Sequence, residues 1–281
     1  GFLLPRAQLA QSIWPDFDAA SFVIAFNFHN LEQSEKVDNF LALISEDSPW
    51  YQRRVVLELE IFQRGQDYAG GLAHIRAYQK FVANHPQQQF DRDTEHAFFE
   101  RWAGNFLRYQ KKYATAIGAY KTALDYVPDD WVTWRSLAIC YERTSQTEKA
   151  EEAFQKGLSL NPNDAVALNY LGYWWADEGR RLDEAIELIK KAVSLYPRSG
   201  AYADSLGWVY YKQEEYDEAV GWLETAIQLD PTDGIIADHL GDAYWQTGRT
   251  DEAYFKWQLA LELGLEAEAE AGTRHKLQNG L

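Results

Sequence analysis

Apolar side chains recur along the chain at the spacing of helices that bury one face. Leu137 and Tyr141 lie four residues apart, and after a polar break the apolar positions resume at Ala150, Phe154 and Gly157. Residues three and four positions apart share one face of an α-helix. The pattern therefore predicts a pair of helices joined by a short turn.

The same pattern returns every 34 or 35 residues through the C-terminal two-thirds of the chain. Small residues mark the first helix of each pair, at Gly104, Ala138, Gly172, Gly207 and Gly241. Alanines mark the second helix, at Ala116, Ala150, Ala185, Ala219 and Ala253, and prolines follow it at Pro128, Pro162, Pro197 and Pro231. Small side chains let two helices approach closely, and proline ends a helix because it lacks a backbone N–H. We expect each unit to be an antiparallel helical hairpin.

This pattern resembles the tetratricopeptide repeat, whose signature is W-x2-L-G-x2-Y, then A-x3-F, A and P over 34 residues. One unit of the chain reads Trp134, Leu137, Ala138, Tyr141, Ala150, Phe154, Gly157 and Pro162. The resemblance implies an all-α fold, a right-handed superhelical solenoid of stacked antiparallel helix hairpins.

Five repeats fit the signature, at 97–130, 131–164, 165–199, 200–233 and 234–267. The third carries one extra residue in its Gly179-Arg180-Arg181 turn, and the fifth has Leu265 where proline is expected. Turns absorb such changes most readily. Residues 268–281 are expected to form a polar helix that caps the array, because stacked repeats bury their apolar faces only against a neighbour.

Residues 1–96 are interpreted as degenerate repeats. Hairpins are expected at 18–49 and at 50–86, which ends at Pro86, and a truncated first hairpin is represented only by a second helix at 7–15. No Gly/Ser or Pro linker divides the chain, so one continuous solenoid is expected. The truncated hairpin and the absence of methionine lead us to expect that the native protein extends further.

Residues 165–281 also resemble, more narrowly, a group of exported repeat proteins of Gram-negative bacteria. The resemblance rests on the runs Asn169-Tyr170-Leu171-Gly172-Tyr173, Leu182-Asp183-Glu184-Ala185, Asp204-Ser205-Leu206-Gly207-Trp208 and Asp238-His239-Leu240-Gly241-Asp242. Such proteins are often lipid-anchored lipoproteins of the outer membrane, and one is the adaptor of a periplasmic C-terminal-processing protease. The resemblance implies a periplasmic or outer-membrane-associated protein. A cytoplasmic location is the alternative, because the signal and lipobox cysteine that would settle the point are not in the sequence.

The tetratricopeptide family also implies where a ligand binds. In that family the first helix of each hairpin lines a concave groove, and its fifth, ninth and twelfth positions point into the groove. These positions, carried onto this chain, give the candidate peptide- or protein-binding residues Arg101, Asn105, Arg108, Arg135, Glu142, Asn169, Tyr173, Asp204, Trp208, Tyr211, Asp238, Asp242 and Trp245.

The candidate groove is basic at its N-terminal end and acidic and aromatic at its C-terminal end. Arginine side chains suit a carboxylate, and tyrosine and tryptophan bury a large area at low cost in entropy. The alternative is that these side chains serve the fold. Asp204 and Asp238 recur at one repeat position and could pair with a neighbouring helix, Trp208 and Trp245 could pack between helices, and surface arginines commonly bridge to local carboxylates.

Charge and residue types exclude several other functions. The formal net charge of −16 disfavours nucleic acid and anionic membranes, which bind through clustered lysine and arginine. No apolar stretch is long enough to insert directly into a membrane. The single cysteine, Cys140, forms no internal disulfide, and the six histidines are scattered without zinc-ligand spacing, so neither a metal nor another cofactor is expected.

The sequence offers no phosphate loop, nucleophile elbow or zinc-protease motif, so no catalysis is expected. We interpret the chain as a scaffold or adaptor that binds a protein or an extended peptide. Two alternatives stay open: a regulatory segment of a longer enzyme, and a structural protein that self-associates into an oligomer.

Overall fold

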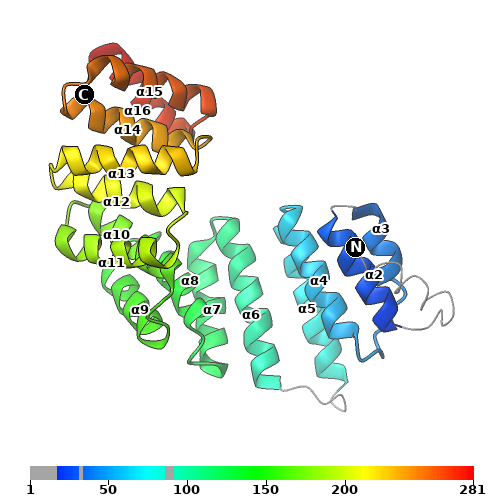
Figure 1. Cartoon of the computed structure of the whole chain (residues 1–281). Coiled ribbons are helices and arrows are strands. Elements are labelled where there is room, and N and C mark those ends of the chain that lie inside the picture. The colour runs from blue at the N-terminus through cyan, green and yellow to red at the C-terminus, as the bar shows by residue number, and fades with distance from the viewer. Residues whose placement is uncertain (1–17, 32–33, 86–91) are drawn as a thin grey trace. The chain divides into compact units, whose positions relative to one another are not determined.

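A computed structural model describes residues 18–31, 34–85 and 92–281. The expected helix at 7–15 and Pro86 lie outside the described residues. The chain divides into two compact units, Gly1–Ala150 (unit 1) and Glu151–Leu281 (unit 2). The described residues form helices and no strands, and the predicted all-α class of stacked antiparallel hairpins is confirmed (Figure 1).

Unit 1 contains three complete hairpins and the start of a fourth. Successive helices pair as α2 with α3, α4 with α5 and α6 with α7, and α8 follows. The helices are α2 (Asp18–Asn30), α3 (Ser34–Leu41), α4 (Tyr51–Arg64), α5 (Tyr68–Asn84), α6 (Arg92–Tyr109), α7 (Tyr113–Tyr126) and α8 (Trp131–Glu142). The boundary between the units falls inside α9 (Thr147–Leu160).

Unit 2 continues with three hairpins and a final helix. They are α10 (Ala165–Asp177) with α11 (Leu182–Leu195), α12 (Gly200–Lys212) with α13 (Tyr216–Leu229), α14 (Gly234–Gln246) with α15 (Thr250–Leu263), and α16 (Ala267–Asn279). Helix α16 packs against α15 (Figure 1). The expectation that both units form one continuous solenoid stays a prediction.

Local sequence explains where the first helices begin. Two residues after a repeat proline stands a short polar residue whose side chain caps the next helix. Asp130 accepts a hydrogen bond from the backbone N–H of Val132, and Asp233 accepts one from that of Ile235. Asp164 and Ser199 do the same for α10 and α12. Each cap satisfies an N–H that would otherwise lack a partner at the helix start.

The inserted residue of the third repeat is absorbed in the hairpin turn. The turns after α4, α6, α8, α12 and α14 each have one residue in the left-handed conformation, such as Glu214 with φ of 64°. The turn between α10 and α11 has two, Gly179 with φ of 67° and Arg181 with φ of 51°. The second left-handed residue lets the longer turn return the chain onto the same packing surface.

The small residues lie where the helices of each hairpin meet. A Cβ atom on Gly104 would come 2.5 Å from the ring of Tyr120, and one on Gly241 would come 2.5 Å from the ring of Trp257. Tyr120 and Trp257 are fully buried. The aromatic side chain of the second helix therefore occupies the space that the glycine leaves.

Successive first helices contact one another in unit 2, which is described throughout. Helix α12 contacts both α10 and α14, whereas the second helices α11, α13 and α15 make no comparable contacts with each other. The first helices therefore line the inner, concave side of this unit. We call the surface formed by α10, α12 and α14 the first-helix face of unit 2, and the one formed by α2, α4, α6 and α8 the first-helix face of unit 1.

Candidate protein-binding faces

The arginines and the asparagine predicted on α6 are engaged within unit 1. Arg101 lies 3.5 Å from the carboxylate of Asp130, the cap of α8. Asn105 accepts a hydrogen bond of 2.8 Å from the hydroxyl of Tyr120. The guanidinium of Arg108 interacts with the same hydroxyl, and its buried Nε has no hydrogen-bond partner in the described part of the chain. These side chains connect α6 to α7 and α8. Arg101 therefore fits the alternative interpretation, in which a surface arginine pairs with a local carboxylate.

The two predicted residues of α8 also have partners. The guanidinium of Arg135 lies 5.4 Å from the centre of the Trp131 ring. Glu142 is mostly covered and lies 3.3 Å from Arg143, which is exposed. Arg101 and Glu142 thus have partners of opposite charge, and Arg135 packs on a ring. That the arginines of this end receive a ligand carboxylate stays a prediction.

Asp204 and Asp238 join successive first helices in unit 2. Asp204 lies 2.9 Å from Nδ1 of His239, and Asp238 accepts a hydrogen bond of 2.7 Å from the hydroxyl of Thr273. Both partners stand 35 residues further along the chain, one position beyond the equivalent repeat position, His239 on α14 and Thr273 on α16. All four side chains are buried. The recurrence of aspartate at this repeat position therefore has a structural cause.

Helix α16 covers the last predicted part of the groove. Nζ of Lys276 lies 2.7 Å from the carboxylates of both Asp238 and Asp242. Asp242 also accepts a hydrogen bond of 2.8 Å from Nε1 of Trp257. Trp245 packs against Trp257 with ring centres 5.5 Å apart. The structure thus places Asp238, Asp242 and Trp245 in the packing of α14 with α15 and α16.

Four predicted residues stay on the open part of the first-helix face of unit 2. They are Asn169, Tyr173, Trp208 and Tyr211, which we call the aromatic shelf, and all four are half-buried. The Trp208 ring stacks on Tyr211 with centres 4.9 Å apart and on His239 with centres 4.1 Å apart. Stacking fixes the planes of the three rings.

Two polar atoms of the aromatic shelf lack a hydrogen-bond partner within unit 2. They are Oδ1 of Asn169, an acceptor, and Nε1 of Trp208, a donor. Buried polar groups in native proteins are almost always paired, so each is free to pair with a ligand. Burial raises the pKa of Tyr173 to about 12, with the carboxylates of Asp177 and Asp204 acting in the same direction. Its hydroxyl therefore stays protonated near neutral pH and can donate a hydrogen bond.

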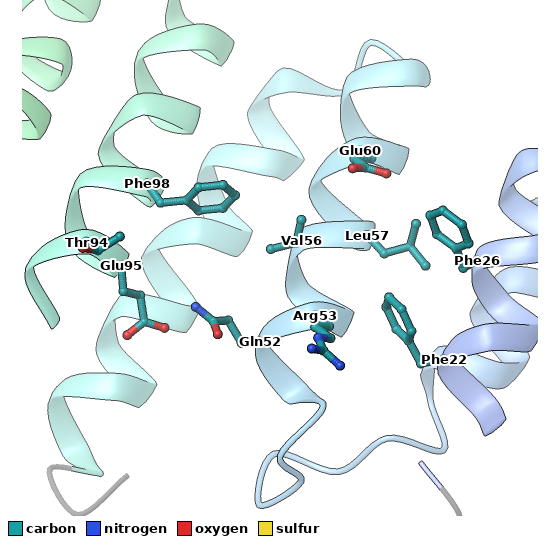
Figure 2. Close-up of a pocket in the computed structure, with 10 residues that line it drawn as sticks. All are labelled: Phe22, Phe26, Gln52, Arg53, Val56, Leu57, Glu60, Thr94, Glu95 and Phe98. Carbon is teal, nitrogen blue, oxygen red and sulfur yellow. The ribbon is translucent and has the colours of Figure 1, made fainter. Parts of the chain in front are cut away.

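Unit 1 has an apolar cavity that sequence reasoning missed. It has a volume of about 710 Å³ and lies on the first-helix face, between α2, α4 and α6 (Figure 2). A sequence signal for part of it exists. Phe22 and Phe26 occupy the fifth and ninth positions of the degenerate repeat at 18–49, the positions that Arg101 and Asn105 occupy in the repeat at 97–130.

Residues 18–31, 34–85 and 92–281 contain no group of three or more His, Cys, Asp or Glu side chains placed to hold a metal ion. Burial raises the pKa of the Cys140 thiol to about 12, although Arg108 opposes this shift, so the thiol is not a ready nucleophile. None of the described helices is long and apolar enough to cross a membrane.

Comparison with known proteins agrees with the repeat pattern. The family models described as "Tetratricopeptide repeat" and "TPR repeat" match residues 107–171 and 207–248. A TPR repeat-containing protein of Pseudomonas aeruginosa is 35% identical over 95 residues, which is 34% of this chain and 16% of that protein. The photosystem I assembly protein Ycf3 of Prochlorococcus marinus is 30% identical over 128 residues, covering 37% of this chain and 73% of Ycf3. The chain belongs to the tetratricopeptide repeat family.

Solved structures show the same fold. The structure of PilF from Pseudomonas aeruginosa matches with a TM-score of 0.57 at 18% identity, over 67% of this chain and 90% of that chain. This likeness concerns the fold. The chain spans less than a fifth of the P. aeruginosa TPR repeat-containing protein that it matches. Arrays of tetratricopeptide repeats serve chiefly as scaffolds for protein–protein interaction.

Proposed function

We propose that the chain is an adaptor whose aromatic shelf holds an extended peptide segment of a partner protein. The observation that carries the proposal is the set of four half-buried side chains on α10 and α12, two of which have an unpaired polar atom. An extended peptide offers one N–H and one C=O per residue. Asn169 Oδ1 would accept from a peptide N–H, and the Trp208 Nε1–H would donate to a peptide C=O.

The stacked rings supply the apolar part of the contact. Aromatic residues dominate the binding energy of protein interfaces because they bury a large area with few rotatable bonds. Trp208 and Tyr211 stack on each other, so together they offer an aromatic surface that a peptide can cover. Asn169 Oδ1 and Trp208 Nε1 are themselves covered, and a ligand would reach them after the two side chains rotate.

The test begins with random peptides displayed on phage and selected against the whole chain. The affinity of a selected peptide is then measured for wild type, Trp208→Ala and the control Phe255→Ala. Phe255 is 62% exposed on the second helix α15. We expect Trp208→Ala to weaken binding by about tenfold or more, as for an interface hot spot, and Phe255→Ala to leave it unchanged. Equal affinities of the peptide for the two variants would show that it does not bind at the aromatic shelf.

We also propose that the adaptor works in the cell envelope of a Gram-negative bacterium, in the periplasm or at the outer membrane. The support is the narrower resemblance of residues 165–281 to exported repeat proteins and the identity shared with a P. aeruginosa repeat protein. Fractionation of cells that produce the tagged native protein tests this location. Recovery with the envelope, and digestion by protease added to spheroplasts, is expected, whereas recovery with the cytoplasm would support the alternative location.

A further inference from the structure

The cavity of unit 1 is built from side chains on one face of three first helices. Figure 2 shows Leu57 of α4 directed toward Phe22 and Phe26 of α2, and Phe98 of α6 directed toward α4 from the opposite side; all four line the cavity. With Val56 these side chains give the cavity an apolar lining. A volume of about 710 Å³ is in the range of preformed binding sites for several side chains or a small ligand.

The helix faces behind the cavity are fixed. Val55 and Leu59 of α4 are fully buried, and Leu57 is part of the core that α2 and α3 form. Phe26, in contrast, is 44% exposed. An aromatic ring left partly in water on a fixed support gains free energy when a partner covers it. The cavity therefore favours an apolar occupant that enters from the first-helix face.

The charged groups of the cavity favour a cationic occupant. Glu60 and Glu95 line it together with one arginine, Arg53, whose guanidinium lies 4.3 Å from the Trp50 ring centre. Glu95 is 6% exposed; its Oε1 accepts a hydrogen bond from the Tyr78 hydroxyl, and its Oε2 has no hydrogen-bond partner in the described part of the chain. A buried carboxylate oxygen without a donor is stabilised by a cation. The net charge of −16 attracts such a partner over a longer range.

We infer that this cavity binds an amphipathic segment of a partner protein, which inserts bulky aliphatic or aromatic side chains between α2, α4 and α6 and brings a lysine or arginine to Glu95 and Glu60. The inference extends the proposed function, on which it rests for the idea that the ligand is a protein segment. The cavity uses residues of unit 1 only, so it can be tested separately from the aromatic shelf.

The probe is a fluorescein-labelled synthetic peptide of leucine and lysine arranged with one apolar helical face. Its affinity for the whole chain is measured by fluorescence anisotropy. Two matched peptides replace leucine by serine or lysine by glutamate. We expect the leucine–lysine peptide to bind about tenfold or more tightly than either replacement, because only this peptide satisfies both the apolar lining and the carboxylates. Equal binding of the serine peptide would mean attraction by net charge alone and would overturn the inference.

Substitutions in the chain show where the peptide probe binds. Phe26→Ser is expected to weaken probe binding by about tenfold, and Phe255→Ser, an exposed phenylalanine of unit 2, to leave it unchanged. Glu60→Gln is expected to weaken binding about threefold, and Glu187→Gln, a carboxylate 78% exposed on α11, to have no effect. Equal losses within either pair would contradict the inference.

Two competing occupants give distinct results. Dodecanoate that binds in a Phe26-dependent way while the peptide does not would make the cavity a lipid site. Concentration-dependent dimerisation that Phe26→Ser abolishes, measured by sedimentation, would assign the cavity to a second copy of the chain. Either result overturns the inference. Trp208→Ala is expected to retain probe binding. A negative result for the cavity can therefore be distinguished from a negative result for the aromatic shelf.

Discussion

At the residue scale, Gly241 sets how closely α14 and α15 approach. The side chain that faces it, Trp257, is fully buried and is held by its hydrogen bond to Asp242. The ring cannot move aside without breaking that bond. Gly221 of α13 offers a contrast, because a Cβ added there meets no atom within 4 Å.

We predict that Gly241→Ala lowers the free energy of unfolding by about 1–3 kcal/mol, the usual cost of overpacking a core. Gly221→Ala is the control and should raise it by up to about 1 kcal/mol, because alanine favours helix more than glycine does. Urea denaturation of the two variants measures both values. Stabilisation by Gly241→Ala would show that the helices can separate at no cost.

His239 makes the stability of unit 2 depend on pH. Burial alone would lower its pKa, but the carboxylate of Asp204, assisted by those of Asp238 and Asp242, raises the pKa above the usual value. The folded state therefore binds the proton more tightly than the unfolded chain does. The stabilisation is complete below the unfolded pKa of about 6.5 and is lost as the pH rises through the higher folded pKa.

We predict that the free energy of unfolding falls as the pH rises above about 6.5, and that His239→Gln removes this part of the fall. His275→Gln is the matched control, because His275 is exposed on α16. Urea denaturation of wild type and both variants across this pH range provides the measurement. The same pH slope in wild type and His239→Gln would show that the Asp204–His239 pair does not take up the proton.

At the scale of elements, Lys276 connects the final helix α16 to α14. Lys276 is 16% exposed and neutralises two carboxylates that are 12% and 5% exposed. Thr273, fully buried, adds a hydrogen bond to Asp238. Leu277, which is partly buried, packs against the core that includes α14 and α15, and these contacts together fix the position of α16.

We predict that Lys276→Ala lowers the free energy of unfolding by about 3 kcal/mol, because it leaves two buried carboxylates without a cation. Arg274→Ala on the same helix should change it by about 0.5 kcal/mol or less, since Arg274 is 60% exposed in its pair with Glu270. Denaturation by urea compares them, and hydrogen exchange of the α14 amides shows where protection is lost. Equal effects would mean that Lys276 is not the anchor of α16.

The elements were predictable because their signals are local. A proline, a spacer and a capping residue, as in Pro231-Thr232-Asp233, mark a helix end and the next start within three residues. The structural role of Asp204 was left open because its partner stands 35 residues away in the next repeat. A polar side chain at a repeat position has the same local sequence signal whether it faces a ligand or the next helix.

At the scale of the whole molecule, each unit has its own candidate face. The aromatic shelf of unit 2 lies at positions that the family resemblance indicated. The cavity of unit 1 was missed for two reasons. The hairpins of this unit depart from the repeat signature, and apolar residues such as those that line the cavity are indistinguishable from core residues in the sequence. The packing of α2, α4 and α6 leaves rings such as Phe26 open. The repeat positions of Phe22 and Phe26 assign them to the first-helix face, but they do not report the opening between the helices.

The central claim is that partners bind the first-helix faces. Site-specific photo-cross-linking tests it most directly, with the photoreactive amino acid benzoylphenylalanine placed at Tyr211, Phe26 or Phe255 of the protein in its native cells. We predict that Tyr211 and Phe26, on first helices, form adducts with a partner protein, and that Phe255, exposed on the second helix α15, forms none. Adducts from Phe255 alone would contradict the account.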